Sequence, residues 1–192
     1  IPDAVVVEGP LAGGHLGFKK EELFKEPIPL RQLIEDTVAA VKPFEEQFGV
    51  EIPVIAAGGL YTGQDIFDIM QAGAKGVKLG ARFVTTHECD ADIAFKQSYI
   101  DCQEGGIDII DSPVGLPGRV VKSAFVDQVQ KGQTKPFKCA WHCLSTCNYK
   151  VAPFCIAQVL HNSSQGKMDD GFAFAGTNAW RATKIQHVSE IV

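Results

Sequence analysis

The sequence predicts an α/β fold built from consecutive parallel strand–helix units. Short apolar runs at residues 3–8, 52–57 and 76–83 are typical of strands. Segments with helical periodicity separate these runs, which is the order expected of parallel units with right-handed crossovers. Each run ends at or near glycine. Doubly wound sheets and (β/α)8 barrels both bind ligands at the carboxyl ends of their strands, so the ligand site is expected at these glycines.

The first two units carry the clearest signals. The run at 3–8 is rich in valine, is expected to be a buried strand and leads into a glycine-rich loop. Apolar residues then recur at three- and four-residue spacing over Leu30–Phe48, which predicts an amphipathic helix. The continuous apolar run at 52–57 is typical of a fully buried parallel strand. Thr62 can cap the next helix, which is expected over 62–72.

The rest of the chain differs in character, because its elements are shorter and turn residues are frequent. The expected elements are a helix at 95–102, an extended segment at 107–111, a turn-rich loop at Ser112–Arg119, helices at 120–131 and 152–165, and a final segment from 172 to Val192.

Composition excludes several classes of partner. The 192 residues are 45% hydrophobic and 21% charged, as in ordinary globular proteins. The formal net charge of −5 provides no positive field for nucleic acid or anionic lipid. No apolar run approaches the ~20 residues that span a bilayer, and no secretory signal pattern opens the sequence. We therefore expect no nucleic-acid partner, no membrane association and a cytoplasmic location.

His15 is the candidate general base. Imidazole has an ordinary pKa near 6.5, so its neutral form can accept a proton at physiological pH. A lone histidine in a loop is usually structural or solvated, but this one directly follows Gly13-Gly14 at a strand end. Those glycines remove the Cβ atoms that would keep a planar ligand away from the backbone. The other four histidines have no such surroundings, and structural roles suffice for them.

Glycines after the second and third strands are candidates for a phosphate cradle. Gly58-Gly59 and Gly80 place exposed backbone N–H groups at strand ends, where phosphate is bound by hydrogen bonds and a favourable dipole. Taken singly, each glycine could merely form a tight turn, but two consecutive units with the same feature favour phosphate. The dinucleotide fingerprint GxGxxG is not found in the required strand–turn–helix context, which disfavours a nicotinamide Rossmann site.

Three motifs together resemble the nitronate monooxygenase family, which also includes flavin-dependent enoyl-acyl carrier protein reductases. They are Glu8–Gly17 with its Ala-Gly-Gly-His core, Ile52–Gly59 and Val77–Phe83. The resemblance implies the C-terminal portion, units six to eight, of an FMN-binding (β/α)8 TIM barrel with a small inserted domain. The implied domains are residues 1–84 for the barrel units, 85–171 for the inserted segment, and 172–192 for the return to the barrel and a terminal helix.

By that resemblance, His15 corresponds to the family's catalytic histidine, which abstracts the α-proton of an alkyl nitronate or lies beside the flavin in the reductases. Gly13 and Gly14 would lie against the flavin. The family often has threonine at the position of Ala81, so a hydroxyl contact to phosphate is expected to be missing. The other implied FMN-binding residues, including those at the phosphate, are Ala57, Gly58, Gly59, Leu79, Gly80 and Ala81.

The resemblance implies an FMN-dependent oxidoreductase, and first of all a nitronate monooxygenase that oxidises alkyl nitronates with O2. The alternative is an NAD(P)H-dependent reductase of enoyl thioesters carried by acyl carrier protein. A third possibility, of another class, is a non-catalytic subunit that completes a barrel on a partner chain. Residue identities do not separate the first two.

The family's barrel begins with roughly five further β/α units that this sequence lacks. Three strands cannot close a barrel, so the N-terminal barrel segment is expected to be missing or to lie on another chain. Uncovered strand faces would favour pairing with another chain, with a homo-oligomer as one form of it. We expect the chain alone to bind FMN weakly.

Four of the six cysteines fall close together, at Cys139, Cys143, Cys147 and Cys155. Spacing by four would align the first three along one face of a helix, and Cys155 could complete a tetrad. Four thiolates suit zinc or an iron–sulfur cluster, although the spacing matches neither the common zinc-finger nor the ferredoxin pattern. Reduced structural cysteines and disulfides remain the alternatives.

The loop Ser112–Arg119 is a candidate substrate contact, because loops after the last barrel strand overhang the ligand face. Arg119 and Lys122 could attract a carboxylate or a phosphopantetheine group. An ordinary surface turn is the equal alternative.

Overall fold

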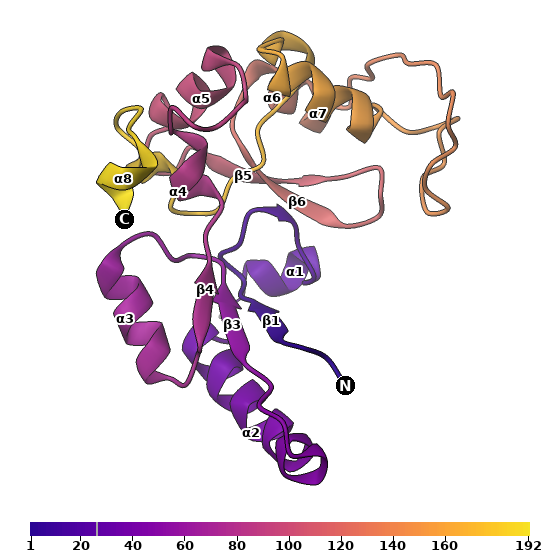
Figure 1. Ribbon diagram of the computed structural model, residues 1–192. Coiled ribbons are helices and arrows are strands. Elements are labelled where there is room, and N and C mark those ends of the chain that lie inside the picture. The colour runs from indigo at the N-terminus through magenta and orange to yellow at the C-terminus, as the bar shows by residue number, and fades with distance from the viewer. Residues whose placement is uncertain (26) are drawn as a thin grey trace.

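Two three-stranded sheets organise the chain, one parallel and one antiparallel (Figure 1). The computed structural model describes residues 1–25 and 27–192. The parallel sheet has the strand order β1-β3-β4, and the antiparallel sheet has the order β2-β6-β5. The strands are β1 (Val5–Glu8), β2 (Gly14–His15), β3 (Val54–Ala57), β4 (Gly76–Lys78), β5 (Ile107–Asp111) and β6 (Pro117–Val121).

Helices pack beside both sheets and connect the strands of the parallel sheet (Figure 1). No helix in the described ranges is long and apolar enough to cross a membrane. The helices are α1 (Lys20–Leu23), α2 (Leu30–Phe48), α3 (Gly63–Gln71), α4 (Ala81–Val84), α5 (Ile93–Ile100), α6 (Ala124–Gln130), α7 (Ile156–Ser164) and α8 (Val188–Ile191), with 3-10 turns η1 (Met168–Asp170) and η2 (Ala179–Arg181).

The parallel sheet contains the first three predicted strands in the predicted order. Val7 of β1 pairs with Ala56 of β3, which in turn pairs with Val77 of β4. Helices α2 and α3 cover one face, where Ile34 and Ile69 join the buried residues of β3 in one core cluster. This arrangement brings the carboxyl ends of the three strands to the same edge of the sheet.

The ends of the two long helices follow from their local sequence. Gly49 adopts a left-handed conformation (φ 66°) and ends α2, a position where glycine has no Cβ penalty. The Thr62 hydroxyl accepts a bond from the Asp65 N–H, while the Asp65 carboxylate accepts one from the Thr62 N–H. Such a reciprocal cap stabilises a helix by about 1 kcal/mol. It fixes the entry into α3 directly after the glycines of the second unit.

The antiparallel sheet joins distant segments of the chain. His15 on β2 lies opposite Gly118 on β6, so the first glycine-rich loop is part of this sheet. The return segment runs along β6 as well, with the Val121 N–H bonded to the Ala173 carbonyl. Next to this sheet, the rings of Phe125 and Phe172 pack in the largest aromatic core cluster. The sheet therefore holds the predicted base and the return segment side by side.

Several expected elements differ in extent. The third strand, expected over 76–83, ends at Lys78, because Gly80 caps the short helix α4 there. The loop expected over Ser112–Arg119 is a hairpin turn whose second arm begins β6, since Pro117 pairs with Asp111. A helix was expected over 120–131, but residues 120–121 belong to β6. The helix begins at Ala124, and Ser123 is its N-cap.

Two further expectations about the first unit were wrong. The glycine-rich loop contains β2, whose pairing with β6 is a long-range contact without a local sequence signal. The strand at 3–8 was expected to be buried, yet Val6 is 54% exposed, because it points away from the sheet face on which Val7 packs against α2 and α3. The domain limits at 84 and 171 remain predictions.

Candidate functional site

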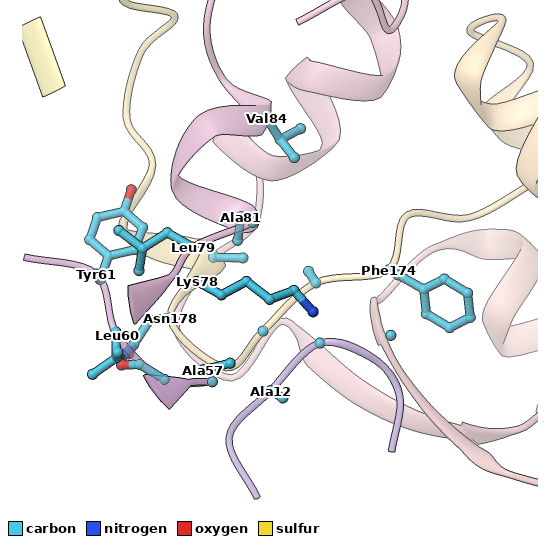
Figure 2. A pocket seen from close by; sticks show the side chains of 18 of the residues that line it. Ala12, Ala57, Leu60, Tyr61, Lys78, Leu79, Ala81, Val84, Phe174 and Asn178 are labelled. Atoms are coloured by element: carbon cyan, nitrogen blue, oxygen red, sulfur yellow. Dashed lines mark hydrogen bonds between the residues drawn. The ribbon is translucent and has the colours of Figure 1, made fainter. Parts of the chain in front are cut away.

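The eight residues predicted to bind a cofactor all line one cavity of about 300 Å³ (Figure 2). They lie at or just after the carboxyl ends of β1, β3 and β4, with Ala57 as the last residue of β3, Gly14 in β2 and Ala81 as the first residue of α4. Phe174 and Asn178 of the return segment line the same cavity. The parallel sheet and the return segment therefore build this site together. The predicted residues are Gly13, Gly14, Ala57, Gly58, Gly59, Leu79, Gly80 and Ala81.

Close backbone packing explains two of these glycines. A Cβ atom added at Gly13 would lie 2.4 Å from the backbone carbon of Ala175 and from the nitrogen of Gly176. Gly58 has a φ of 92°, and a Cβ there would lie 2.9 Å from the Cβ of Ala12. Side chains at either position would push the loops apart. The cavity therefore depends on glycine for its shape.

Backbone donors suit the cavity to a phosphate group. Within the described ranges, the N–H groups of Gly59 and Gly80 donate to no protein acceptor. Free N–H groups at strand ends and helix starts bind phosphate well. Ala81 adds no hydroxyl, as the sequence indicated. These residues fit the phosphate of FMN through backbone donors alone.

Side chains from the return segment and the strand ends complete the cavity. The Asn178 amide donates to the Gly59 carbonyl at 2.6 Å and so ties the return segment to the second glycine loop. Lys78 extends along the cavity in Figure 2, and its Nζ lies 3.6 Å from a carboxylate oxygen of Glu8. The Tyr99 hydroxyl donates to the Phe174 carbonyl, and burial raises the pKa of Tyr99, so it stays a donor.

His15 lies at the border of this cavity and is held from two sides. Its Nε2 atom lies 2.8 Å from the Ser112 hydroxyl, within hydrogen-bond distance. The ring of Phe174 contacts the imidazole edge-on, with centroids 4.8 Å apart. Partial burial lowers the pKa of His15 below its ordinary value. The imidazole is therefore neutral at physiological pH, which is the state a general base requires.

Sequence reasoning missed Phe174 as a site residue, and it missed the bond between Ser112 and His15. Ser112 was predicted only as part of the candidate substrate loop Ser112–Arg119, and its 97-residue separation from His15 leaves no periodic signal for that bond. Phe174 was expected to belong to the return segment, without a role at the site. It packs across Gly118, where an added Cβ would lie 2.8 Å from the Phe174 ring. A glycine opposite His15 in the ladder thus makes room for the ring.

Arg119 was predicted as a group that could attract a carboxylate or a phosphopantetheine, and the structure gives its guanidinium other partners. The side chain is 5% exposed, and Nη1 donates to the carbonyl oxygens of Pro10, at 2.7 Å, and Ala12. It therefore holds the chain that enters the glycine-rich loop. Lys122 is also occupied, because its Nζ donates to the Gly105 carbonyl. Neither contact supports the expected attraction of a carboxylate.

The cysteine segment differs from expectation too. Residues 139–147 are not helical, so the thiols do not line one face of a helix. Partial burial and the neighbouring thiols raise the pKa of Cys147, and all six cysteines are free. Over residues 1–25 and 27–192, no group of three or more His, Cys, Asp or Glu side chains could hold a metal ion. The structure therefore does not form the predicted site for zinc or an iron–sulfur cluster at Cys139, Cys143, Cys147 and Cys155.

The glycine packing gives a direct test of the cavity. Replacing Gly13 with alanine is expected to lower the free energy of unfolding by about 3 kcal/mol, because the new methyl group meets fixed backbone. Gly17→Ala is the matched control in the same loop, since a Cβ there meets nothing within 4 Å. Urea denaturation measures both variants. Equal stability of the two would show that the loop has room at Gly13.

Comparison with known proteins places this architecture in a family. The profile of the nitronate monooxygenase family matches residues 1–192. A probable nitronate monooxygenase of Staphylococcus haemolyticus is 31% identical over 138 residues, which is 70% of this chain and 36% of that protein. The (3aS,4S,5R,7aS)-5-hydroxy-7a-methyl-1-oxo-octahydro-1H-indene-4-carboxyl-CoA dehydrogenase of Mycobacterium tuberculosis is 31% identical over 130 residues, 68% of this chain and 32% of that protein.

Solved structures show the same fold. FabK from Thermotoga maritima superposes with a TM-score of 0.72 at 24% identity, over 98% of this chain and 51% of its own. Nitroalkane oxidase from Streptomyces ansochromogenes gives 0.69 at 23% identity, over 98% of this chain and 49% of its own. The chain thus spans about half of these structures and about a third of the curated relatives. Because the family profile matches residues 1–192, the chain belongs to the nitronate monooxygenase family.

Proposed function

We propose that this chain forms part of an FMN-dependent oxidoreductase that oxidises alkyl nitronates with O2, with His15 as the base. The observation that carries the proposal is the position of His15. A neutral imidazole, bonded to Ser112 and packed on Phe174, borders a glycine-lined cavity whose backbone donors suit a phosphate group. In the family to which the chain belongs, a nitronate is the named substrate.

In this proposal, the glycines, His15 and Ser112 have separate roles. The backbone donors of Gly59 and Gly80 hold the phosphate, and Gly13 and Gly14 let the ring system approach the chain. His15 takes the α-proton of a neutral nitroalkane, which leaves the nitronate and an imidazolium. Ser112 orients the imidazole during this transfer. FMN, when bound, supplies the electron acceptor, with O2 as the final oxidant.

A second candidate is the reduction of enoyl thioesters with NAD(P)H. The relative from Mycobacterium tuberculosis is named for a CoA thioester, which favours a thioester substrate for this chain as well. The same cavity and the same histidine would serve, with a reduced nicotinamide as the electron source. A non-catalytic role in completing a barrel on a partner chain is the third reading. The exposed Val6 face would then be covered by further β/α units.

One pair of assays tests the choice. The chain, together with whatever segment completes its barrel, is supplied with FMN. It is then given nitroethane, or the nitronate formed from it, with O2 in one assay, and NAD(P)H with a crotonyl thioester in the other. The proposal predicts oxygen consumption in the first assay and no thioester reduction in the second. Activity in the second assay alone would establish the reductase. Tight FMN binding without activity in either assay would favour the non-catalytic role.

A further inference from the structure

A second cavity, of about 730 Å³, is lined by His15. Most of its lining is apolar, and within the described residues none of the lining side chains is an acid, lysine or arginine. His15 and Thr146 are its polar side chains. Its lining residues are His15, Val114, Gly115, Leu116, Leu144, Thr146, Ile156, Ala157 and Leu160. The glycine-lined cavity shares none of these residues. His15 borders both spaces, because it lines this one and touches Phe174, which lines the other.

Three separate segments build the second cavity. The hairpin between β5 and β6 contributes Leu116. Helix α7 contributes Ile156 and Leu160, which lie one turn apart on one face. The segment between α6 and α7 contributes Leu144 and is the long orange loop of Figure 1. All three walls belong to the part of the chain that follows the parallel sheet.

We propose that this second cavity binds an unbranched hydrocarbon tail of the substrate, and that the loop between α6 and α7 sets the length of tail accepted. The placement of the reacting carbon at His15 rests on the proposed function. The absence of charged lining residues among those described makes a tail that ends in a carboxylate unfavourable here, since nothing would pair with it. The chain is thus expected to prefer simple alkyl substrates to propionate 3-nitronate.

The loop can adjust because few bonds fix it. In the described backbone, the one hydrogen bond within residues 139–147 joins the Cys147 N–H to the Leu144 carbonyl. A T-shaped contact between the rings of His142 and Tyr149, with centroids 4.4 Å apart, joins two parts of this loop. Segments with so few backbone bonds shift at low cost in free energy. Leu144 can therefore follow tails of different length.

Binding of neutral nitroalkanes, measured by calorimetry without O2, tests the inference apart from turnover. Across the series from nitroethane to 1-nitrohexane, we expect about fourfold tighter binding per added methylene, the factor that ~0.8 kcal/mol per buried CH2 gives. Leu144→Trp fills the cavity and is expected to abolish this gain for the longer compounds. Val151→Trp is the matched control on the same loop, because Val151 is 74% exposed and does not line the cavity.

Leu116→Trp, placed on the opposite wall, repeats the test should Leu144→Trp fail to fold. Affinity that does not change with alkyl length in the unmodified chain, here called a flat series, would overturn the inference. So would an undiminished gain in affinity per methylene in a folded Leu144→Trp or Leu116→Trp variant. A steep series in a protein that oxidises no nitronate would count against the proposed function alone. Nitronate turnover together with a flat series would count against the tail site alone.

Discussion

Replacing His15 with asparagine is expected to reduce the turnover of a neutral nitroalkane by about 10²–10⁴-fold, the usual contribution of a positioned general base. Asparagine keeps a polar group of similar size near Ser112 but cannot accept a proton at physiological pH. The imidazole does not line the glycine-lined cavity, and β2 pairs with β6 through its backbone. FMN affinity, measured by fluorescence titration, should therefore stay within about twofold, a change of less than ~0.5 kcal/mol.

The pH profile gives the same prediction a second readout. Burial lowers the pKa of His15, so kcat/KM is expected to stay level around neutral pH and to fall only when the pH drops below the ordinary imidazole value of about 6.5. Stability follows the same direction. Below that pH the unfolded chain binds the proton more readily than the folded one, so acid destabilises the fold.

His161→Asn is the matched control, because His161 is exposed on α7 and lines neither cavity. Its turnover and pH profile should equal those of the unmodified protein. Turnover that survives in His15→Asn, with the acid limb of the profile intact, would remove His15 from the chemistry and favour the non-catalytic reading.

The parallel units could be predicted from the sequence because their signals are local. The apolar spacing over Leu30–Phe48 predicted α2 with its true limits, and the Thr62 cap predicted the start of α3. Glycine at strand ends predicted the cavity, since parallel strands bring their carboxyl ends to one edge. Short-range patterns of this kind depend on little beyond the backbone geometry of one unit.

What could not be predicted depends on contacts between distant segments. The pairing of β2 with β6 turns a loop into a strand, and its partner lies about a hundred residues away. The bond between His15 and Ser112 follows from that pairing, so no local pattern in the sequence linked the two residues. The Cys139–Cys147 spacing has helical periodicity, but apolar residues at matching positions are too few to form a buried helical face.

Replacing Arg119 with methionine is expected to lower the free energy of unfolding by roughly 3 kcal/mol, because two buried backbone carbonyls lose their donor at about 1–3 kcal/mol each. Methionine keeps much of the side-chain volume, so the loss reports the hydrogen bonds more than a cavity. Arg31→Met is the control, since Arg31 is half exposed and its bonds to the Glu35 carboxylate and the Asp68 carbonyl lie at the surface, where water replaces them at little cost. Urea denaturation measures both variants.

The effect of Arg119 substitutions on FMN affinity shows whether this arginine positions the site or only stabilises the fold. Arg119 holds the carbonyls of Pro10 and Ala12, which directly precede Gly13 and Gly14, while its own backbone pairs with Gly14. Without the guanidinium, the glycine-rich loop can move away from Ala175. FMN affinity should then fall, and His15 should shift from its position. Arg119→Lys can reach one carbonyl at a time and should restore part of the affinity. Unchanged FMN affinity in a destabilised Arg119→Met variant would show that the arginine supports the fold but does not shape the cavity.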